Sequence, residues 1–360
     1  MLRLLGGVPN ADTFAQPLPL LLVALKRMFL QRRGASDSQV NYPLADQIYD
    51  AAYPKQAFTQ FLETEQLTRS TIAEVLEEMR EYSGQYFKPE KPLRCLDDWQ
   101  AGTLLKFSFK YFAEHGEPNL SGPIFWKETF AEEFLPYFLR HGTRTVLVLR
   151  DPRDVITSQV MGESALHAGP PRPLLYIARQ WRKSAAYALA FRENPRFEVI
   201  PYERLVTNTD HVIGSMLRRF RVTSRSAVET PIDTSAVLED WLGNSSFGAI
   251  RNISSDSIGR FRGRLSEDHR RFIEALCYSE MKALGYQPQI RSTEVREILE
   301  YGPTKDFRAR PDLARYAYQH ERIAEELNRH RSLTDVDGAF DQTIHIFEAA
   351  FDACRRVRER

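Results

Sequence analysis

The sequence predicts an α/β protein whose parallel sheet is wound with helices. Three short runs, "GPIFWKE", "TVLVLR" and "FEVIPYE", have the length and the β-branched or aromatic content of strands. Helical stretches at 131–140 and 173–192 separate them, and this alternation is the pattern of a parallel sheet. The chain of 360 residues is 42% hydrophobic and 11% aromatic, which suffices for one large core or two modest ones.

The elements before the first of these strands are predicted to be helices. "PLPLLLVALKRMFL" is too short for a membrane span and lacks a cleavage pattern, so we interpret it as an ordinary buried helix and not as a signal peptide. "TQFLETEQLTRSTIAEVLEEMREY", from Thr59 to about Tyr82, has amphipathic spacing. "AGTLLKFSFKYFAEHG" is a further helix that Gly116 ends.

The stretch "TVLVLRDPRDVITS" changes character in its middle. Thr145 to Leu149 are apolar or β-branched without alternation, which predicts a strand buried on both faces. Asp151 is a suitable helix cap and Pro152 is suited to a first helical turn. Arg150 is therefore expected between the end of a strand and the start of a helix.

Composition narrows the classes of partner and compartment. The net charge is only +1, so no global field marks a nucleic-acid-binding protein, and an anion site must come from local clustering. The three cysteines, Cys95, Cys277 and Cys354, lie far apart in the sequence. This spacing disfavours a disulfide scaffold or a metal site of paired thiols, and we expect a reducing, cytoplasmic location without a bound metal.

The residues at the ends of the three strands are Lys127, Arg150 and Tyr202. Ligands of parallel α/β sheets bind at the carboxyl ends of the strands, so two cations and a phenol there predict a pocket for an anion attached to a ring. Each residue also has a plainer interpretation: a solvated strand end for Lys127, an ion pair with Asp151 or Asp154 for Arg150, and a core position for Tyr202. The coincidence of all three favours the pocket.

Arg150 and Ser158 are predicted to form one phosphate clamp. A guanidinium can hold a phosphate with two parallel hydrogen bonds, and the start of the following helix offers N–H groups to the same anion. Ser158 lies two turns into that helix and adds a hydroxyl.

Three segments carry a resemblance to one enzyme family. "LVLRDPRDVITS" resembles the 3′-phosphate-binding segment of sulfotransferases that use 3′-phosphoadenosine 5′-phosphosulfate (PAPS), in which an arginine ends a strand and a serine follows eight positions later. "VIPYERLVTN" is similar to the family's strand and "YEDL" segment, and "GRFRGRLSEDHRRFIEALCYSEMKALGY" resembles the closing segment of many bacterial members. The resemblance runs from about Ile124 to Tyr286.

The resemblance implies a sulfotransferase domain with a P-loop-like parallel sheet over residues 1–290 and a helical C-terminal extension over 291–360. It implies metal-free transfer of a sulfuryl group from PAPS to a hydroxyl or amine of a small-molecule, carbohydrate or lipid acceptor. The charge and the N-terminal segment, as argued above, predict no nucleic-acid partner and no membrane span. The extension could cover the core, contribute to acceptor binding or mediate a homodimer, and the sequence does not rank these.

The resemblance also assigns roles to single residues. Tyr202 would lie near the adenine, and Lys127 would face the sulfuryl group. Cytosolic animal members carry a histidine base two positions after that lysine, where this chain has Thr129. Glu128 is the nearest candidate base, and its alternative role is a salt bridge to Lys127.

The segment "FGAIRNISSDSIGRFRGR" is the candidate for the family's second arginine at the 3′-phosphate. Its Ser, Asn and Gly content predicts a loop that could cover a nucleotide. Arg251 is favoured by position and Arg260 by motif, while solvated surface charges are the alternative for either.

One family feature has no counterpart. Members open with a strand and a phosphate loop of the type "P-x-x-S-G-T-T", whereas "MLRLLGGVPNADTF" looks like the segment that follows that loop. Two interpretations are open: an active sulfotransferase whose sequence begins one element late, without the first strand, or a degenerate, non-catalytic nucleotide-binding or interaction protein. A P-loop kinase fits less well. Under the first interpretation the chain as given should turn over negligibly, and an upstream extension should restore activity.

Overall fold

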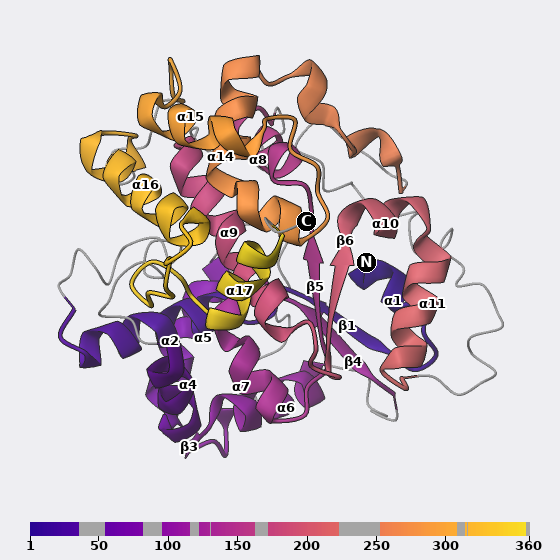
Figure 1. Cartoon of the computed structure of the whole chain (residues 1–360). Coiled ribbons are helices and arrows are strands. Elements are labelled where there is room, and N and C mark those ends of the chain that lie inside the picture. The colour runs from indigo at the N-terminus through magenta and orange to yellow at the C-terminus, as the bar shows by residue number, and fades with distance from the viewer. Residues whose placement is uncertain are drawn as a thin grey trace. The chain divides into compact units, whose positions relative to one another are not determined.

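The computed structural model describes most of the chain as an α/β structure (Figure 1). The described residues are 1–35, 55–81, 96–115, 122–129, 131–162, 172–222, 253–307, 314 and 316–357. They divide into two compact units, each with its own hydrophobic core. The first unit comprises the described residues up to 145 and residues 208–222, and the second comprises residues 146–207 and 253–357.

The sheet of the first unit is a parallel pair of strands. β1 (Asp12–Ala15) and β4 (Ile124–Lys127) run in the same direction with Ala15 opposite Lys127. β4 is the predicted "GPIFWKE" strand. β1 was not predicted, because only one of its four side chains is buried and four residues are too few to show a period.

Helices surround this pair. The short α1 (Leu2–Leu5) precedes β1, and α2 (Pro19–Arg32) follows it. α2 is the buried helix predicted from "PLPLLLVALKRMFL", and its leucines enter the core. No helix within the described ranges has both the length and the apolarity needed to cross a membrane.

The long helix predicted from Thr59 to Tyr82 is wrong, because two helices occupy this stretch. α4 (Lys55–Thr64) and α5 (Arg69–Glu81) are separated by β2 (Leu67–Thr68), which pairs antiparallel with β3 (Ala101–Gly102). Tertiary pairing of Leu67 thus overrides the continuous helical period. The unit is completed by α6 (Leu104–His115), the 3₁₀ helix η3 (Glu132–Phe134), α7 (Leu135–Arg140) and α11 (Thr209–Arg219).

The second unit contains the other two predicted strands, β5 (Thr145–Leu149, of which all but the first residue lies in this unit) and β6 (Phe197–Pro201). Figure 1 shows them side by side and pointing the same way. Only Leu149 of β5 is buried, so the prediction of a strand buried on both faces is wrong. Among the described residues β5 pairs with β6 alone, and two strands form too narrow a sheet to be covered fully on both faces.

The helices of the second unit include the one predicted over 173–192. α8 (Pro152–Val160), α9 (Leu174–Phe191) and α10 (Tyr202–Thr207) accompany the strands, and 3₁₀ turns η4 (Ser255–Ser257) and η5 (Arg260–Gly263) lead to α14 (Glu267–Ala283). The remaining elements are η6 (Ser292–Glu294), α15 (Val295–Tyr301), α16 (His320–Thr334) and α17 (Glu348–Arg356). The 290/291 boundary lies inside this unit.

The C-terminal helices pack on the helices that flank β5 and β6. α17 contacts both α9 and α14, and α15 contacts α14 and α16. Phe351 and Cys354 of α17 share an apolar cluster with Leu189 of α9. Of the three roles left open for the extension, these contacts show that it covers the core of its own unit.

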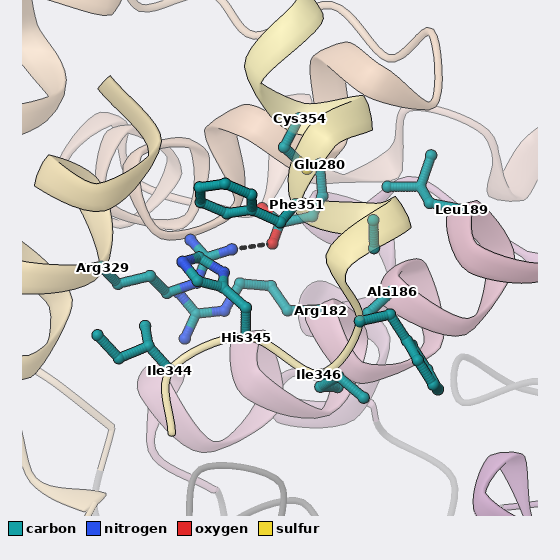
Figure 2. A pocket seen from close by; sticks show the side chains of 12 residues that line it. Arg182, Ala186, Leu189, Glu280, Arg329, Ile344, His345, Ile346, Phe351 and Cys354 are labelled. Atoms are coloured by element: carbon teal, nitrogen blue, oxygen red, sulfur yellow. Dashed lines mark hydrogen bonds and ion pairs between the residues drawn. The ribbon is translucent and has the colours of Figure 1, made fainter. Parts of the chain in front are cut away.

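A buried ionic cluster joins α16 to α9. Both carboxylate oxygens of Glu326 bind arginines, Arg182 Nη1 at 2.5 Å and Arg179 Nη2 at 2.9 Å. Burial opposes the charged form of Glu326, but the two arginines outweigh it and lower the pKa to about 2. Figure 2 shows Arg182 beside a second pair, in which Arg329 of α16 binds Glu280 of α14.

We expect Glu326→Gln to reduce the unfolding free energy by about 3–5 kcal/mol, because it leaves the buried Arg182 without a counter-charge and Arg179 with only the exposed Glu325. The matched control is Glu325→Gln: Glu325 also pairs with Arg179, at 2.6 Å, but its side chain is 46% exposed against 3% for Glu326. The control should lose less than about 1 kcal/mol. Urea unfolding measures both losses. An equally small loss in the two variants would contradict the conclusion that Glu326 compensates buried arginine charge.

Candidate functional site

The turn from β5 into α8 has the predicted local structure. β5 ends at Leu149, and Asp151 caps α8 by accepting the Arg153 N–H at 2.9 Å. Pro152 occupies the first turn, where its missing N–H costs nothing. Arg150 therefore lies between the strand and the capped helix.

The guanidinium of Arg150 lies over the ring of Tyr202, 4.8 Å from the ring centroid. Its Nη2 donates to the Ser257 carbonyl and is 3.7 Å from the nearer Asp154 oxygen. The side chain is 18% exposed, and its Nε–H is buried without a hydrogen-bond partner. The ends of β5 and β6 thus bring Arg150 and Tyr202 together, and the alternative pairing of Arg150 with Asp154 is realised at a longer distance.

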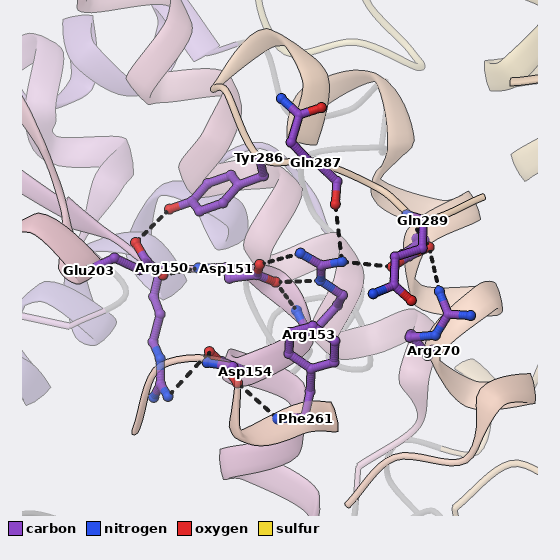
Figure 3. A network of polar contacts seen from close by, with 12 residues as sticks. Arg150, Asp151, Arg153, Asp154, Glu203, Phe261, Arg270, Tyr286, Gln287 and Gln289 are labelled. Carbon is purple, nitrogen blue, oxygen red and sulfur yellow. Dashed lines mark hydrogen bonds and ion pairs between the residues drawn. The ribbon is translucent and has the colours of Figure 1, made fainter. Parts of the chain in front are cut away.

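Residues 255–263 lie against these two side chains (Figure 3). The Tyr202 hydroxyl is 2.8 Å from the Ser257 hydroxyl. Asp154 is almost fully buried, and its two oxygens accept the N–H groups of Gly259 at 2.7 Å and Phe261 at 3.0 Å. Asp154 therefore fixes this segment to the first turn of α8, and with it the Ser257 contacts.

Three further residues were predicted to bind the nucleotide, and the structure describes two of them. Ser158 is half-buried in α8, eight residues beyond Arg150. Arg260 starts η5 in the segment that carries Ser257, and its Nη2 donates to the Asp256 carbonyl at 3.4 Å. Arg251 lies outside the described residues.

Fewer N–H groups are available to an anion at the start of α8 than the sequence predicted. The helix start was expected to offer N–H groups to the anion, but its cap Asp151 accepts the N–H of Arg153. The Arg153 side chain is also occupied, by Asp151 at 2.6 Å, by Glu274 at 2.7 Å and by the ring of Phe261. Burial would lower the pKa of Arg153, but Asp151 and Glu274 reverse this and raise it. Arg153 therefore has a structural role, because its side chain is fully engaged by neighbouring residues.

Three main-chain groups at the turn each bind a side chain that sequence analysis did not single out. The Trp181 indole N–H donates to the Arg150 carbonyl at 2.7 Å, and Glu203 accepts the Asp151 N–H at 2.9 Å. The Tyr286 hydroxyl donates to the carbonyl of the last β5 residue at 3.3 Å. Glu203 and Tyr286 stand inside the motifs "VIPYERL" and "LGY", which were the available signals, whereas Trp181 had none.

The first unit holds the other pair of candidates, Lys127 and Glu128, at the end of β4. One Glu128 oxygen accepts the Leu18 N–H at 2.9 Å, and the other is buried without a partner. Burial raises the pKa of Glu128 to about 8, which the Leu18 bond and Lys127 only partly offset. Within the described residues no ion pair joins Glu128 to Lys127, so the predicted alternative of a salt bridge is not realised.

Lys127 is exposed overall. Protein atoms around its ammonium group nevertheless desolvate that group, and this lowers the pKa of Lys127. Beside it lies Gln16, which sequence analysis missed. Gln16 has a left-handed φ of 53°, is buried, and donates its N–H to the Lys127 carbonyl at 2.7 Å and its amide to the Thr129 hydroxyl. A non-glycine residue in this conformation is strained and must be held by such contacts.

Comparison with known proteins adds nothing to these observations, since no family model, no curated protein and no solved structure matches the chain. In the described ranges no group of three or more His, Cys, Asp or Glu side chains is arranged to hold a metal ion.

We expect Glu128 to make stability depend on pH. Its pKa is about 8 in the folded chain against 4.5 ordinarily, so between these values the folded state keeps a proton that the unfolded state loses. The unfolding free energy should therefore fall by about 2 kcal/mol as the pH rises through this window. This value is smaller than the free energy that corresponds to the whole pKa shift, because the residue is only half-buried.

Urea unfolding at about pH 5 and about pH 8.5 measures this contribution as the difference between wild type and Glu128→Gln. Glu74→Gln, at an exposed residue of α5, is the control and should follow the wild type. A Glu128→Gln variant with the same pH dependence as the wild type would contradict the prediction.

Proposed function

We propose that this chain is a sulfotransferase that uses PAPS and that Arg150 binds the 3′-phosphate of the nucleotide. The observation that carries the proposal is the Arg150 guanidinium, which lies at a parallel strand end over Tyr202 and has a buried N–H without a partner. The resemblance of "LVLRDPRDVITS" to the family's 3′-phosphate segment supports the same assignment.

The charges around Arg150 are compatible with a phosphate. The nearby carboxylates are already compensated: Asp151 by Arg153, and Asp154 by two main-chain N–H groups. Tyr202 orients the guanidinium by stacking and contributes no charge. Ser257 offers a hydroxyl beside Tyr202, so we propose Ser257, together with Ser158 and Arg260, as further ligands of the nucleotide.

We further propose that Lys127 and Glu128 act on the reacting groups. We assign Glu128 as the base that takes the proton from the acceptor hydroxyl or amine as that atom bonds to sulfur and the sulfur–oxygen bond to the nucleotide phosphate breaks. A carboxylate with a pKa of about 8 suits this role, because a base is most effective when its pKa lies near the working pH. Lys127 would stabilise negative charge on the sulfuryl oxygens.

A non-catalytic nucleotide-binding protein is the second candidate. It is favoured by the contact between Arg150 and the Ser257 carbonyl, which occupies part of the guanidinium. This candidate binds adenosine 3′,5′-bisphosphate but transfers no sulfuryl group. The two are separated by supplying PAPS with a panel of hydroxyl and amine acceptors, including carbohydrates and lipids, to the chain as given and to an N-terminally extended form.

We expect Arg150→Ala to weaken binding of adenosine 3′,5′-bisphosphate at least about tenfold, since it removes charge-assisted hydrogen bonds to a phosphate. Calorimetry measures the affinity. Arg296→Ala, at a largely exposed arginine of α15 that pairs with Glu300, is the control and should bind like the wild type. An unchanged affinity in a folded Arg150→Ala variant would remove Arg150 from the nucleotide site.

In a form of the chain that turns over PAPS, turnover should increase with pH up to a pKa near 8, because Glu128 must lose its proton before it can act as a base. Glu128→Gln should lower kcat by about 10²-fold or more and abolish this limb while nucleotide affinity stays unchanged. The measurement is the pH profile of kcat for wild type and variant. A variant that keeps the wild-type limb would exclude Glu128 as the base.

A further inference from the structure

We propose that Trp181 is a positioning residue for the Arg150 site and acts by holding the peptide group that carries the arginine. The peptide between Arg150 and Asp151 is bound at both ends: its carbonyl accepts the Trp181 indole N–H at 2.7 Å, and its N–H donates to Glu203 at 2.9 Å. Two bonds on opposite sides of one rigid plane prevent that plane from rotating.

The orientation of this peptide determines where the guanidinium lies. Rotation of the plane changes the backbone dihedrals on either side of it, and with them the direction in which the Arg150 side chain leaves the main chain. The side chain is long, so a small rotation moves its end by a large distance. Displacements on the order of 1 Å already weaken a site that depends on fixed donors.

Trp181 is itself firmly held. It is 4% exposed, and its ring packs edge-on against the Tyr286 ring at a centroid distance of 6.2 Å. It lies on α9 between Arg179 and Arg182, and both of these bind the buried Glu326 of α16. The indole is thus held by α9, by the ion pairs that join α9 to α16, and by the Tyr286 ring.

The inference rests on the proposed function for its ligand, and the experiment separates the two. Trp181→Phe keeps an aromatic ring and removes the N–H donor together with the pyrrole ring of the buried indole, a loss of packing that the control variant below shares. The first readout is the affinity for adenosine 3′,5′-bisphosphate, measured by calorimetry for Trp181→Phe, Arg150→Ala and the double variant. The second needs no ligand: it is the NMR resonance of the Arg150 Nε–H, identified by its loss in Arg150→Ala.

The chain offers a matched control. Trp99 is also a buried tryptophan, 9% exposed, whose indole N–H donates to a strand carbonyl, that of Leu67, at 2.9 Å. Trp99→Phe removes the same chemical group in the first unit. It should reduce stability as Trp181→Phe does, while affinity and the Arg150 resonance stay unchanged.

We expect Trp181→Phe to weaken nucleotide binding about threefold to tenfold and to shift the Arg150 resonance. In the Arg150→Ala background it should have no further effect on affinity, because its action passes through the arginine. Additive losses, or an unshifted resonance in a folded variant, would overturn the proposal. If the wild type does not bind the nucleotide but the resonance still shifts, the proposed function fails and the positioning role stands.

Discussion

The second unit depends on the requirement that a strand ending inside the protein must satisfy its main-chain polar groups. Each unmet carbonyl or N–H costs about 1–3 kcal/mol when it is buried. At the end of β5 these groups are met by side chains from α9, from α10 and from the segment after α14. Three regions distant in sequence must therefore assemble before Arg150 acquires a defined position.

Buried ion pairs connect the helices around this strand end to one another. Arg153 binds Asp151 and Glu274, which joins the start of α8 to α14, and Arg182 binds Glu326 and the Leu276 carbonyl, which joins α9 to α16 and α14. Such pairs add little net stability compared with apolar residues of the same size, because desolvation offsets their attraction. Their geometry is nevertheless exacting, and each arginine accepts only one arrangement of its neighbours.

Local patterns of the sequence were sufficient where the structure is decided locally. β5, β6 and the capped start of α8 follow from apolar runs and from Asp151 and Pro152, whose effects reach only a few residues. The helix predicted over 59–82 failed because Leu67 pairs with Gly102, which no local period reveals. The occupation of Arg153 was missed for the same reason, since its partner Glu274 is 121 residues away.

At Glu128, the candidate base, the absence of an expected contact determines the pKa of the carboxyl. The sequence suggested that Glu128 pairs with its neighbour Lys127, and a close ammonium group would hold the pKa of the carboxyl low and make it a weak base. The carboxyl instead turns toward the Leu18 N–H and leaves one oxygen buried and unpaired. Burial then dominates, and the pKa rises to about 8. The strained Gln16 turn leads directly to Leu18, so the backbone there, and not a salt bridge, determines the chemistry available to Glu128.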